Sequence, residues 1–311
     1  MLLMLCIIGF IVLLLIGLKI YQKMSHKTFI SEARIPDKVV IVTGANTGIG
    51  YATAKELARR GARVILACRD LDKARTAADE IKLATGHEII VKHLDLSSFQ
   101  SILSFANDII ETEGVVDVLI NNAGTGVLDN SLTKDNLPIE AQVNHFGPFL
   151  LTMLLLPVMT SRHTRIINVS SLMHKFGTIE NLDKQAKNFF QRRSVYANTK
   201  LANILFTRKL AEELKDQDVT VNCLHPGAVS TDIFRNQPRI IRFLFRLLFL
   251  TPEEGAQTVV YLAVSKTMDG VTGKYYTNCT EETPAQRALD DEAANKLWKM
   301  SLQICFSKQK L

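Results

Sequence analysis

The sequence lacks the cysteine patterns that build disulfide-rich or zinc-bound folds. Its five cysteines are scattered, with no Cys-x-x-Cys pair and no Cys/His spacing that suits zinc. They are Cys6, Cys68, Cys223, Cys279 and Cys305. This distribution fits a reducing compartment and predicts that the protein binds no metal.

The chain also lacks any basic run interleaved with base-stacking aromatic residues. Its formal net charge is +6, from 37 Lys and Arg against 31 Asp and Glu, but the basic residues are spread along the sequence. Nucleic-acid-binding proteins usually gather them on one segment or face. We therefore expect no nucleic-acid partner. Internal repeats and low-complexity tracts are absent too, so the chain of 311 residues is expected to contain one large α/β domain.

Charged residues are absent from Met1 to Leu18. Counted as far as Ile20, this apolar stretch would reach about 30 Å as a helix, enough to cross a bilayer core. A cleaved signal peptide is the alternative, but no basic residue precedes the stretch and no small-residue cleavage site follows it. We expect residues 1–20 to be a retained membrane anchor, residues 21–37 a linker, and residues 38–311 the folded domain.

Lysines directly after the apolar stretch predict the topology. Lys19, Lys23 and Lys27 follow the stretch and nothing basic precedes it, so the positive-inside rule places the folded domain in the cytosol. The sequon Asn278-Cys279-Thr280 offers a check, because that asparagine could be glycosylated if the domain were luminal.

Short β-branched runs alternate with helical segments along the rest of the chain. The strand-like runs are 39–42, 64–67, 89–93, 116–120, 165–169, 219–224 and 274–276. Segments with helical apolar spacing include 52–60, 101–110, 150–159 and 197–214. This alternation predicts a doubly wound, Rossmann-type parallel sheet with helices on both faces.

A glycine-rich turn directly follows the first predicted strand and opens a helix. It contains Gly44, Asn46, Thr47, Gly48, Ile49 and Gly50, in the spacing G-x-x-x-G-x-G. Glycines at such a turn let the backbone approach a pyrophosphate, whose charge then lies at the helix N-terminus. A glycine cluster alone is a weak signal, but its position between a strand and a helix favours a dinucleotide site.

The residues after the second predicted strand bear on the choice of dinucleotide. They are Cys68, Arg69 and Asp70, so a ribose 2′-phosphate would meet a cation before an acid, which favours NADP(H) over NAD(H). The alternative is a solvated Arg69–Asp70 pair that starts a helix. Asp95, after the third strand, could bind the adenine amino group or could cap the helix near Ser97.

The segment Tyr196-Ala197-Asn198-Thr199-Lys200 places a phenol and an ammonium one helical turn apart. A tyrosine with a free pKa of about 10 acts as a base near neutral pH only if positive charge stabilises its phenolate. Lys200 and an oxidised nicotinamide could supply that charge. Tyr51 and Lys55 repeat the spacing, so context must decide between the two pairs.

That context comes from residues predicted at the carboxyl ends of the strands, where doubly wound sheets bind ligands. The fifth strand is followed by Ser170 and Ser171, and a serine hydroxyl there can hold a carbonyl or alcohol oxygen. The fourth strand ends in Asn121-Asn122-Ala123-Gly124 and the sixth in His225-Pro226-Gly227. Asn144 is an unusual residue in mid-helix and suggests a role, whereas His225 is more typical of a structural turn.

With these residues in place, the chain resembles the short-chain dehydrogenase/reductase superfamily, and within it the microsomal retinol dehydrogenases. The resemblance covers residues from about 37 to 298. It rests on TGANTGIG, LACRD, LDLSS, LINNAG, VNHFG, RIINVSS, YANTKLANILFTRKLA and HPGAVSTD, in the family's order. The family also carries an N-terminal hydrophobic anchor.

The resemblance implies a catalytic set of Asn144, Ser171, Tyr196 and Lys200. Tyr196 would transfer the proton while hydride passes between the nicotinamide and the substrate carbon, and Ser171 would orient the substrate oxygen. Lys200 would bind the nicotinamide ribose and lower the Tyr196 pKa, and Asn144 would hold a water that relays the proton. The implied cofactor residues are Gly44, Asn46, Thr47, Gly48, Ile49, Gly50, Arg69, Asp95, Asn121, Ala123, Gly124, Tyr196, Lys200, Pro226 and Gly227.

The resemblance implies a lipophilic alcohol or aldehyde as substrate, foremost a retinoid, and an endoplasmic reticulum membrane. A steroid or a fatty aldehyde is the alternative substrate, and a non-catalytic NADP-binding scaffold is the alternative function. Residues 125–128 and Pro148 depart from the family pattern beside the expected substrate pocket. Arginines recur at helical spacing among the phenylalanines and leucines of residues 235–250, so residues 240–250 are expected to lie on the membrane surface or to pack as a lid.

Overall fold

The computed structural model describes residues 17, 19, 26–126, 130–159, 163–230 and 247–307. Most of the expected anchor, residues 1–20, and most of the expected membrane-surface segment, residues 240–250, lie outside these ranges. Within them, one helical stretch, Ile139–Val158, is long and apolar enough to span a bilayer, but 67% of its most apolar window is buried inside the fold.

Eight strands form one sheet in the order β3-β2-β1-β4-β5-β6-β7-β8. The strands are β1 (Val39–Thr43), β2 (Arg63–Cys68), β3 (Ile89–His93), β4 (Val118–Asn121), β5 (Thr164–Val169), β6 (Val219–His225), β7 (Tyr275–Thr277) and β8 (Thr280–Glu282). β1 to β7 are parallel, as the sequence predicts. The sequence analysis did not predict β8, which folds back antiparallel on β7 through a tight turn.

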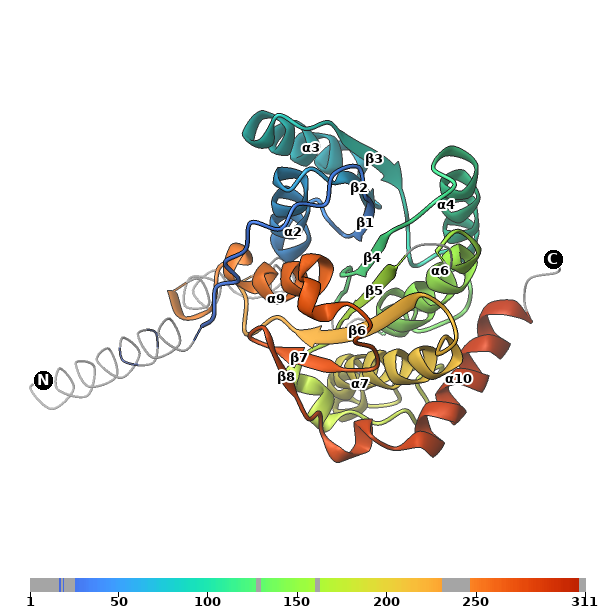
Figure 1. Ribbon diagram of the computed structural model, residues 1–311. Helices are drawn as coiled ribbons and strands as arrows, with labels where there is room; N and C mark the ends of the chain where they lie inside the picture. Colours follow the sequence, from blue (N-terminus) through green and yellow to red (C-terminus); the bar gives the residue numbers. More distant parts are fainter. Residues whose placement is uncertain are drawn as a thin grey trace, which may run out of the picture.

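Helices cover both faces of the sheet (Figure 1). The principal helices are α2 (Gly48–Arg59), α3 (Leu71–Thr85), α4 (Phe99–Thr112), α6 (Gly147–Leu155), α7 (Phe189–Glu213), α9 (Pro252–Val264) and α10 (Asp291–Phe306). One core lies between the sheet and α2, α3 and α9, and the other between the sheet and α4, α6 and α7, with α10 packed outside α7.

Alternate residues of each central strand contribute their side chains to one or the other of the two cores. In β1, Val40 and Val42 face the core under α2, whereas Val39 and Ile41 face the core under α4 and α6. A strand that is buried on both sides needs a continuous run of apolar residues, and such runs predict these strands from the sequence.

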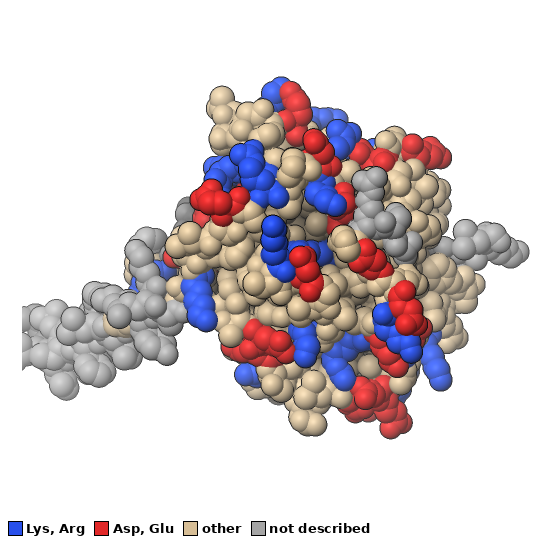
Figure 2. Space-filling view, viewed as in Figure 1, with Lys and Arg blue, Asp and Glu red and all other residues tan. Residues whose placement is uncertain are grey.

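The connections between the strands include short helical pieces. They are α5 (Ile139–Ala141), the π-helix η1 (Gln142–Phe146), and the 3₁₀ turns η2 (Leu156–Val158), η3 (Leu172–Phe176), η5 (Lys266–Met268) and η6 (Gln286–Ala288). η1 contains Asn144, the expected catalytic asparagine, and η3 directly follows Ser171, the expected catalytic serine. Figure 2 shows cationic and anionic side chains interleaved over one face, so the net positive charge is not gathered there.

Candidate active site

The glycine-rich turn lies at the point where the strand order reverses, between β1 and β4. Gly44 has φ +63°, and a Cβ on Gly44 would lie 3.0 Å from Ala123 in the turn after β4. A Cβ on Gly50 would lie 2.5 Å from Nδ2 of Asn122 and 2.6 Å from the Gly44 carbonyl oxygen. A side chain at either position would meet the neighbouring turn, so only glycine fits there.

Hydrogen bonds join the turn after β1 to the turn after β4. The Thr43 hydroxyl accepts hydrogen bonds from the backbone N–H groups of Asn122 and Ala123, each at 3.0 Å. Asn122 Nδ2 in turn donates to the Thr43 carbonyl at 2.8 Å. The two turns therefore form one rigid cradle at the start of α2, where a helix N-terminus favours a phosphate.

At the end of β2, the side chains of Arg69 and Asp70 have different partners. The Asp70 carboxylate caps α3 by accepting from the Lys73 backbone N–H at 3.1 Å, and it forms an ion pair with Lys73 Nζ at 3.1 Å. Arg69 is exposed and forms no ion pair with any side chain that the structure describes. The carboxylate is thus held by the helix, and the guanidinium stays available at the edge of the cradle.

Asp95 follows β3 and turns back on its own loop. Its Oδ1 accepts hydrogen bonds from the Ser97 backbone N–H at 2.9 Å and the Ser97 hydroxyl at 2.6 Å, while Ser98 caps α4.

Asn121 is deeper in the fold: its buried side chain donates to Thr152 at 3.0 Å and Asn168 at 2.8 Å. The side chain of Asn121 therefore joins β4, β5 and α6, and its role toward a cofactor stays a prediction.

The structure brings Ser171, Tyr196 and Lys200 together beyond the carboxyl end of β5. Lys200 Nζ donates to the carbonyl of Val169, the last residue of β5, at 3.0 Å, and lies 5.4 Å from the centre of the Tyr196 ring. Ser171 lies close enough to Tyr196 for its hydroxyl to oppose the rise in the tyrosine pKa. The pair at Tyr51 and Lys55 lies instead in the first turns of α2, so the two Tyr-x-x-x-Lys segments differ in place.

The two adjacent serines have different surroundings. Ser170 is 2% exposed, and its hydroxyl donates to the Lys200 carbonyl at 2.7 Å, which fastens β5 to α7. Ser171 is partly exposed, and within the described part of the chain its hydroxyl accepts one long hydrogen bond, of 3.3 Å, from the Met173 backbone N–H besides lying close to Tyr196. The geometry favours Ser171 as the serine that can meet a substrate oxygen.

Burial shifts the pKa values of both Tyr196 and Lys200 toward their neutral forms. It raises the pKa of Tyr196 to about 12, with a smaller contribution from the Glu140 carboxylate. It lowers the pKa of Lys200 to about 8. In the protein alone the phenol is therefore protonated at neutral pH, the state of a proton donor. The expected lowering of the Tyr196 pKa by Lys200 stays a prediction for the complex with oxidised nicotinamide.

Asn144 lies at the centre of the π-helix η1 and is 1% exposed. Its side-chain amide pairs with the backbone of Thr125, accepting from the N–H at 2.7 Å and donating to the carbonyl at 2.8 Å. It also donates to the Thr199 hydroxyl at 3.1 Å. A Cβ on Gly124 would lie 3.5 Å from both Asn144 Oδ1 and Lys200 Nζ. Asn144 therefore joins the turn after β4 to α7, and the expected water relay remains a prediction.

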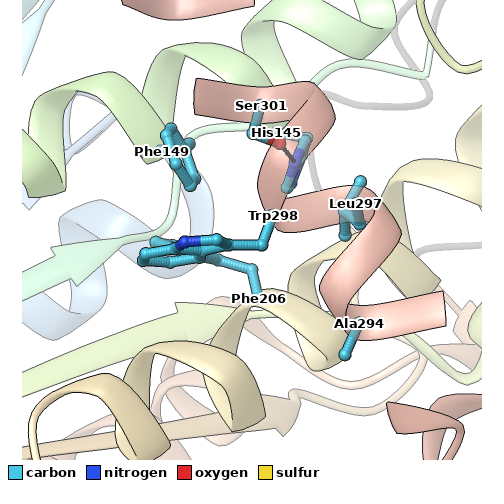
Figure 3. A pocket seen from close by; sticks show the side chains of 7 residues that line it. All are labelled: His145, Phe149, Phe206, Ala294, Leu297, Trp298 and Ser301. Carbon is cyan, nitrogen blue, oxygen red and sulfur yellow. Dashed lines mark hydrogen bonds between the residues drawn. The ribbon is translucent and has the colours of Figure 1, made fainter. Parts of the chain in front are cut away.

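Behind Asn144, a closed apolar pocket contains His145, with α10 forming one wall (Figure 3). His145 Nε2 lies 2.9 Å from the Ser301 hydroxyl, and Phe206 stacks on Trp298 with ring centres 6.2 Å apart. The space between these side chains is too narrow for a water molecule. We interpret the pocket as the packing that holds η1 in place.

The sequence analysis did not identify His174, a residue of η3 whose side chain contacts the backbone of Ser171. Its Nδ1 lies 2.8 Å from the Ser171 carbonyl oxygen, and its Nε2 accepts from the Ala285 backbone N–H at 3.1 Å. Nδ1 therefore carries the proton. Nothing in the sequence around His174 signals this contact, because its partner lies 111 residues away.

The sixth strand contributes His225, Pro226 and Gly227 to the same edge of the sheet. Burial lowers the pKa of His225 to about 4, so the ring is neutral near pH 7. Gly227 has φ +91° and adjoins Leu250. Among the described residues, no three His, Cys, Asp or Glu side chains gather as a metal site would require.

Comparison with known proteins agrees with this arrangement. The short chain dehydrogenase family profile matches residues 38–240. Mouse retinol dehydrogenase 11 is 42% identical over 298 residues, 94% of each chain. Human retinol dehydrogenase 13 is 44% identical over 286 residues, 88% of this chain and 86% of its own.

Solved structures show the same fold. An uncharacterised protein from Mycobacterium paratuberculosis superposes with a TM-score of 0.71 and 31% identity, over 90% of this chain and 98% of its own. A short chain dehydrogenase from Burkholderia cenocepacia, solved in complex with NADP, superposes with a TM-score of 0.64 at 24% identity, over 78% of this chain and 97% of its own. The chain thus belongs to the short chain dehydrogenase family of oxidoreductases and resembles the retinol dehydrogenases within it.

Proposed function

We propose that the protein transfers hydride between NADP(H) and a lipophilic alcohol or aldehyde, foremost a retinoid, at a membrane. The observation that carries the proposal is the meeting of Ser171, Tyr196 and Lys200 beyond β5, beside the cradle of Gly44 and Gly50. A bound NADPH would supply the hydride, and every other step falls to side chains of this chain.

In the direction of reduction, the carbonyl oxygen gains a proton as its carbon gains hydride. Tyr196, neutral because its pKa is about 12, donates that proton, and the Ser171 hydroxyl holds the same oxygen. The phenolate left behind lies near Lys200 Nζ, 5.4 Å from the ring centre, and is stabilised when that amine is protonated. Oxidation of an alcohol uses the same groups in reverse.

The cofactor preference depends on Arg69. Because Asp70 is committed to the α3 cap and to Lys73, a ribose 2′-phosphate at the end of β2 would meet the exposed Arg69 guanidinium without an opposing carboxylate. NAD(H) would lose that charge-assisted contact, which is worth about 1.5–3 kcal/mol.

The choice of a retinoid rests on the relatives, whose names identify them as retinol dehydrogenases. A steroid or a fatty aldehyde would suit the same catalytic residues and is the alternative substrate. An anchor at residues 1–20, in the endoplasmic reticulum membrane with the folded domain toward the cytosol, is part of the proposal and would supply lipophilic substrates from the bilayer.

The test is NADPH consumption by membranes that contain the full chain, with all-trans-retinal, medium-chain aldehydes and ketosteroids offered in turn. Turnover of retinal with NADPH preferred to NADH is the expected result. Turnover of the other carbonyls alone would discard the retinoid and keep the chemistry. If no carbonyl were reduced with either cofactor, the non-catalytic alternative would replace the proposal.

A further inference from the structure

The segment that precedes the first strand lies against the folded domain. We name residues 26–35 the strap. At its beginning, Lys27 donates from its backbone N–H to Asn278 Oδ1 at 2.6 Å and from Nζ to the Thr280 hydroxyl at 2.7 Å. Further along, the Phe29 backbone N–H donates to Gln257 Oε1 at 3.0 Å. The strap is therefore bound to the domain from its first residues, unlike a free linker.

The second half of the strap is bound by Arg60, which is 5% exposed. Its guanidinium donates to the carbonyls of Ser31 at 2.9 Å and Ala33 at 2.7 Å. The same guanidinium lies 5.7 Å from the centre of the Phe29 ring, which also packs edge-on against Tyr261 at 5.3 Å. A buried cation that satisfies two carbonyls and an aromatic ring holds the strap in one conformation.

The strap runs from the carboxyl edge of the sheet to its amino edge (Figure 1). Asn278 directly follows β7, and Thr277 of β7 pairs with His225, the last residue of β6. The strap therefore begins at the edge that carries the catalytic residues. It ends where the Ile35 backbone N–H donates to the Arg60 carbonyl at 3.0 Å, just before β1 and β2 begin.

This path fixes where the apolar N-terminal stretch joins the domain. Eight positions lead from Leu18 to His26, which span at most about 28 Å when fully extended. Lys19 Nζ donates to the Phe249 carbonyl at 2.6 Å, and the neighbouring Leu250 forms a β-bridge with Val229 beyond β6. Lys19, which directly follows the uncharged stretch, thus lies beside the catalytic edge and not beside the opposite one.

Several exposed large apolar side chains lie on connections beyond the carboxyl ends of the strands. Leu172, Met173 and Phe176 of η3 follow Ser171 and are 47%, 42% and 68% exposed. Leu132, after β4, and Leu247, before the bridge to Val229, are exposed there too. Exposed apolar residues of this size, with a lysine at position 175 among them, suit an interface with anionic lipid.

We propose that the strap fixes the catalytic edge of the sheet against the lipid bilayer, with η3 at the membrane surface. A lipophilic substrate then reaches Ser171 and Tyr196 from the bilayer without crossing water. The lipid contact is an inference from the strap and the apolar edge, whereas the identity of the substrate rests on the proposed function.

The test places a fluorophore on a single accessible cysteine in the full chain, reconstituted in phosphatidylcholine vesicles with a minor fraction of phosphatidylserine. Cys68, Cys223 and Cys305 are buried and stay in place. Cys6 and Cys279 are changed to serine, and the label is attached after Phe176→Cys or, as the control on the far edge, Leu83→Cys. We expect nitroxide lipids to quench the label at 176 and aqueous iodide to quench it at least about fivefold less than the label at 83. Equal iodide quenching at both positions would overturn the proposal.

Two further measurements distinguish the possible reasons why the label at position 176 is protected from iodide. If protection at 176 followed protein concentration and persisted in detergent, a second copy of the chain would cover the edge, and the lipid proposal would be wrong. Combining Lys27→Ala with Gln257→Ala loosens the strap, so the label at 176 should gain iodide access, whereas Gln100→Ala on α4 should not change it. Carbonyl reduction, measured in parallel, reports separately on the proposed function.

Discussion

At the residue scale, the two serines after β5 differ in what they bind. Ser171→Ala removes the hydroxyl that faces Tyr196 and should lower kcat about 10²–10³-fold, the usual cost of one transition-state hydrogen bond donor. Ser170→Ala removes the bond to the Lys200 carbonyl and should cost about 1 kcal/mol of unfolding free energy with a much smaller change in kcat. Comparable kcat losses in the two variants would refute the assignment.

Arg69 offers a second test at this scale. Arg69→Gln removes the cation proposed to meet the 2′-phosphate, so the KM for NADPH should rise about 10–100-fold, as expected for a lost charge-assisted hydrogen bond, while the KM for NADH changes little. Arg75→Gln is the matched control, because Arg75 is also exposed and pairs with Asp72 on the surface of α3. Equal effects of Arg69→Gln on both cofactors would contradict the proposed preference.

The neighbours of individual side chains explain what the sequence could not predict. Asn121, Asn144, Ser170 and Asp70 all carry groups suited to ligand binding, and all lie near the predicted site. The structure shows that each is bonded within the fold. Sequence position gives the strand end at which a residue lies, but not which partner its side chain meets.

At the scale of elements, α10 is joined to η1 through His145, which is fully buried. Burial lowers the pKa of His145 to about 4, whereas a histidine in the unfolded chain protonates near pH 6.5. Between these values the unfolded state binds more protons, so the free energy of unfolding should fall as the pH drops from about 6.5 toward 4, by up to about 1.4 kcal/mol per pH unit.

Thermal or denaturant unfolding of the wild type and His145→Gln at pH 7.5 and pH 5 measures this contribution. The variant is expected to be less stable at pH 7.5, because it disturbs the packing against Ser301 and Trp298, but to lose less further stability at pH 5. An identical pH dependence of the two proteins would show that His145 is protonated in the folded state as readily as in the unfolded one.

Elements differ in how far the sequence predicts them. β1 to β6 lie within two residues of the predicted runs, because strands buried on both faces must be continuously apolar. The start of α3 directly after Asp70 agrees with the alternative interpretation of the Arg69–Asp70 pair, but its apolar periodicity is weak because its buried face consists mostly of small side chains, Ala74, Ala77 and Ala78. β8 has three exposed residues and is a strand only because the chain turns back on β7.

At the scale of the whole molecule, the order of the strands brings separate motifs to one edge. The glycine turn after β1 and the Ser171, Tyr196 and Lys200 set are far apart in the chain, yet both lie at carboxyl ends of parallel strands. This convergence was predictable from the alternation of strands and helices. The course of the strap was not, because its contacts with Asn278 and Arg60 depend on the finished fold.

The central claim is that Tyr196 is the proton donor, and the chain contains its own control in Tyr51, which has the same spacing to a lysine. The decisive measurement is the rate of NADPH-dependent carbonyl reduction by membranes that contain the wild type, Tyr196→Phe or Tyr51→Phe. We predict a loss of roughly 10²–10⁴-fold in Tyr196→Phe and near wild-type turnover in Tyr51→Phe. Retained turnover in Tyr196→Phe would contradict the assignment of the active site.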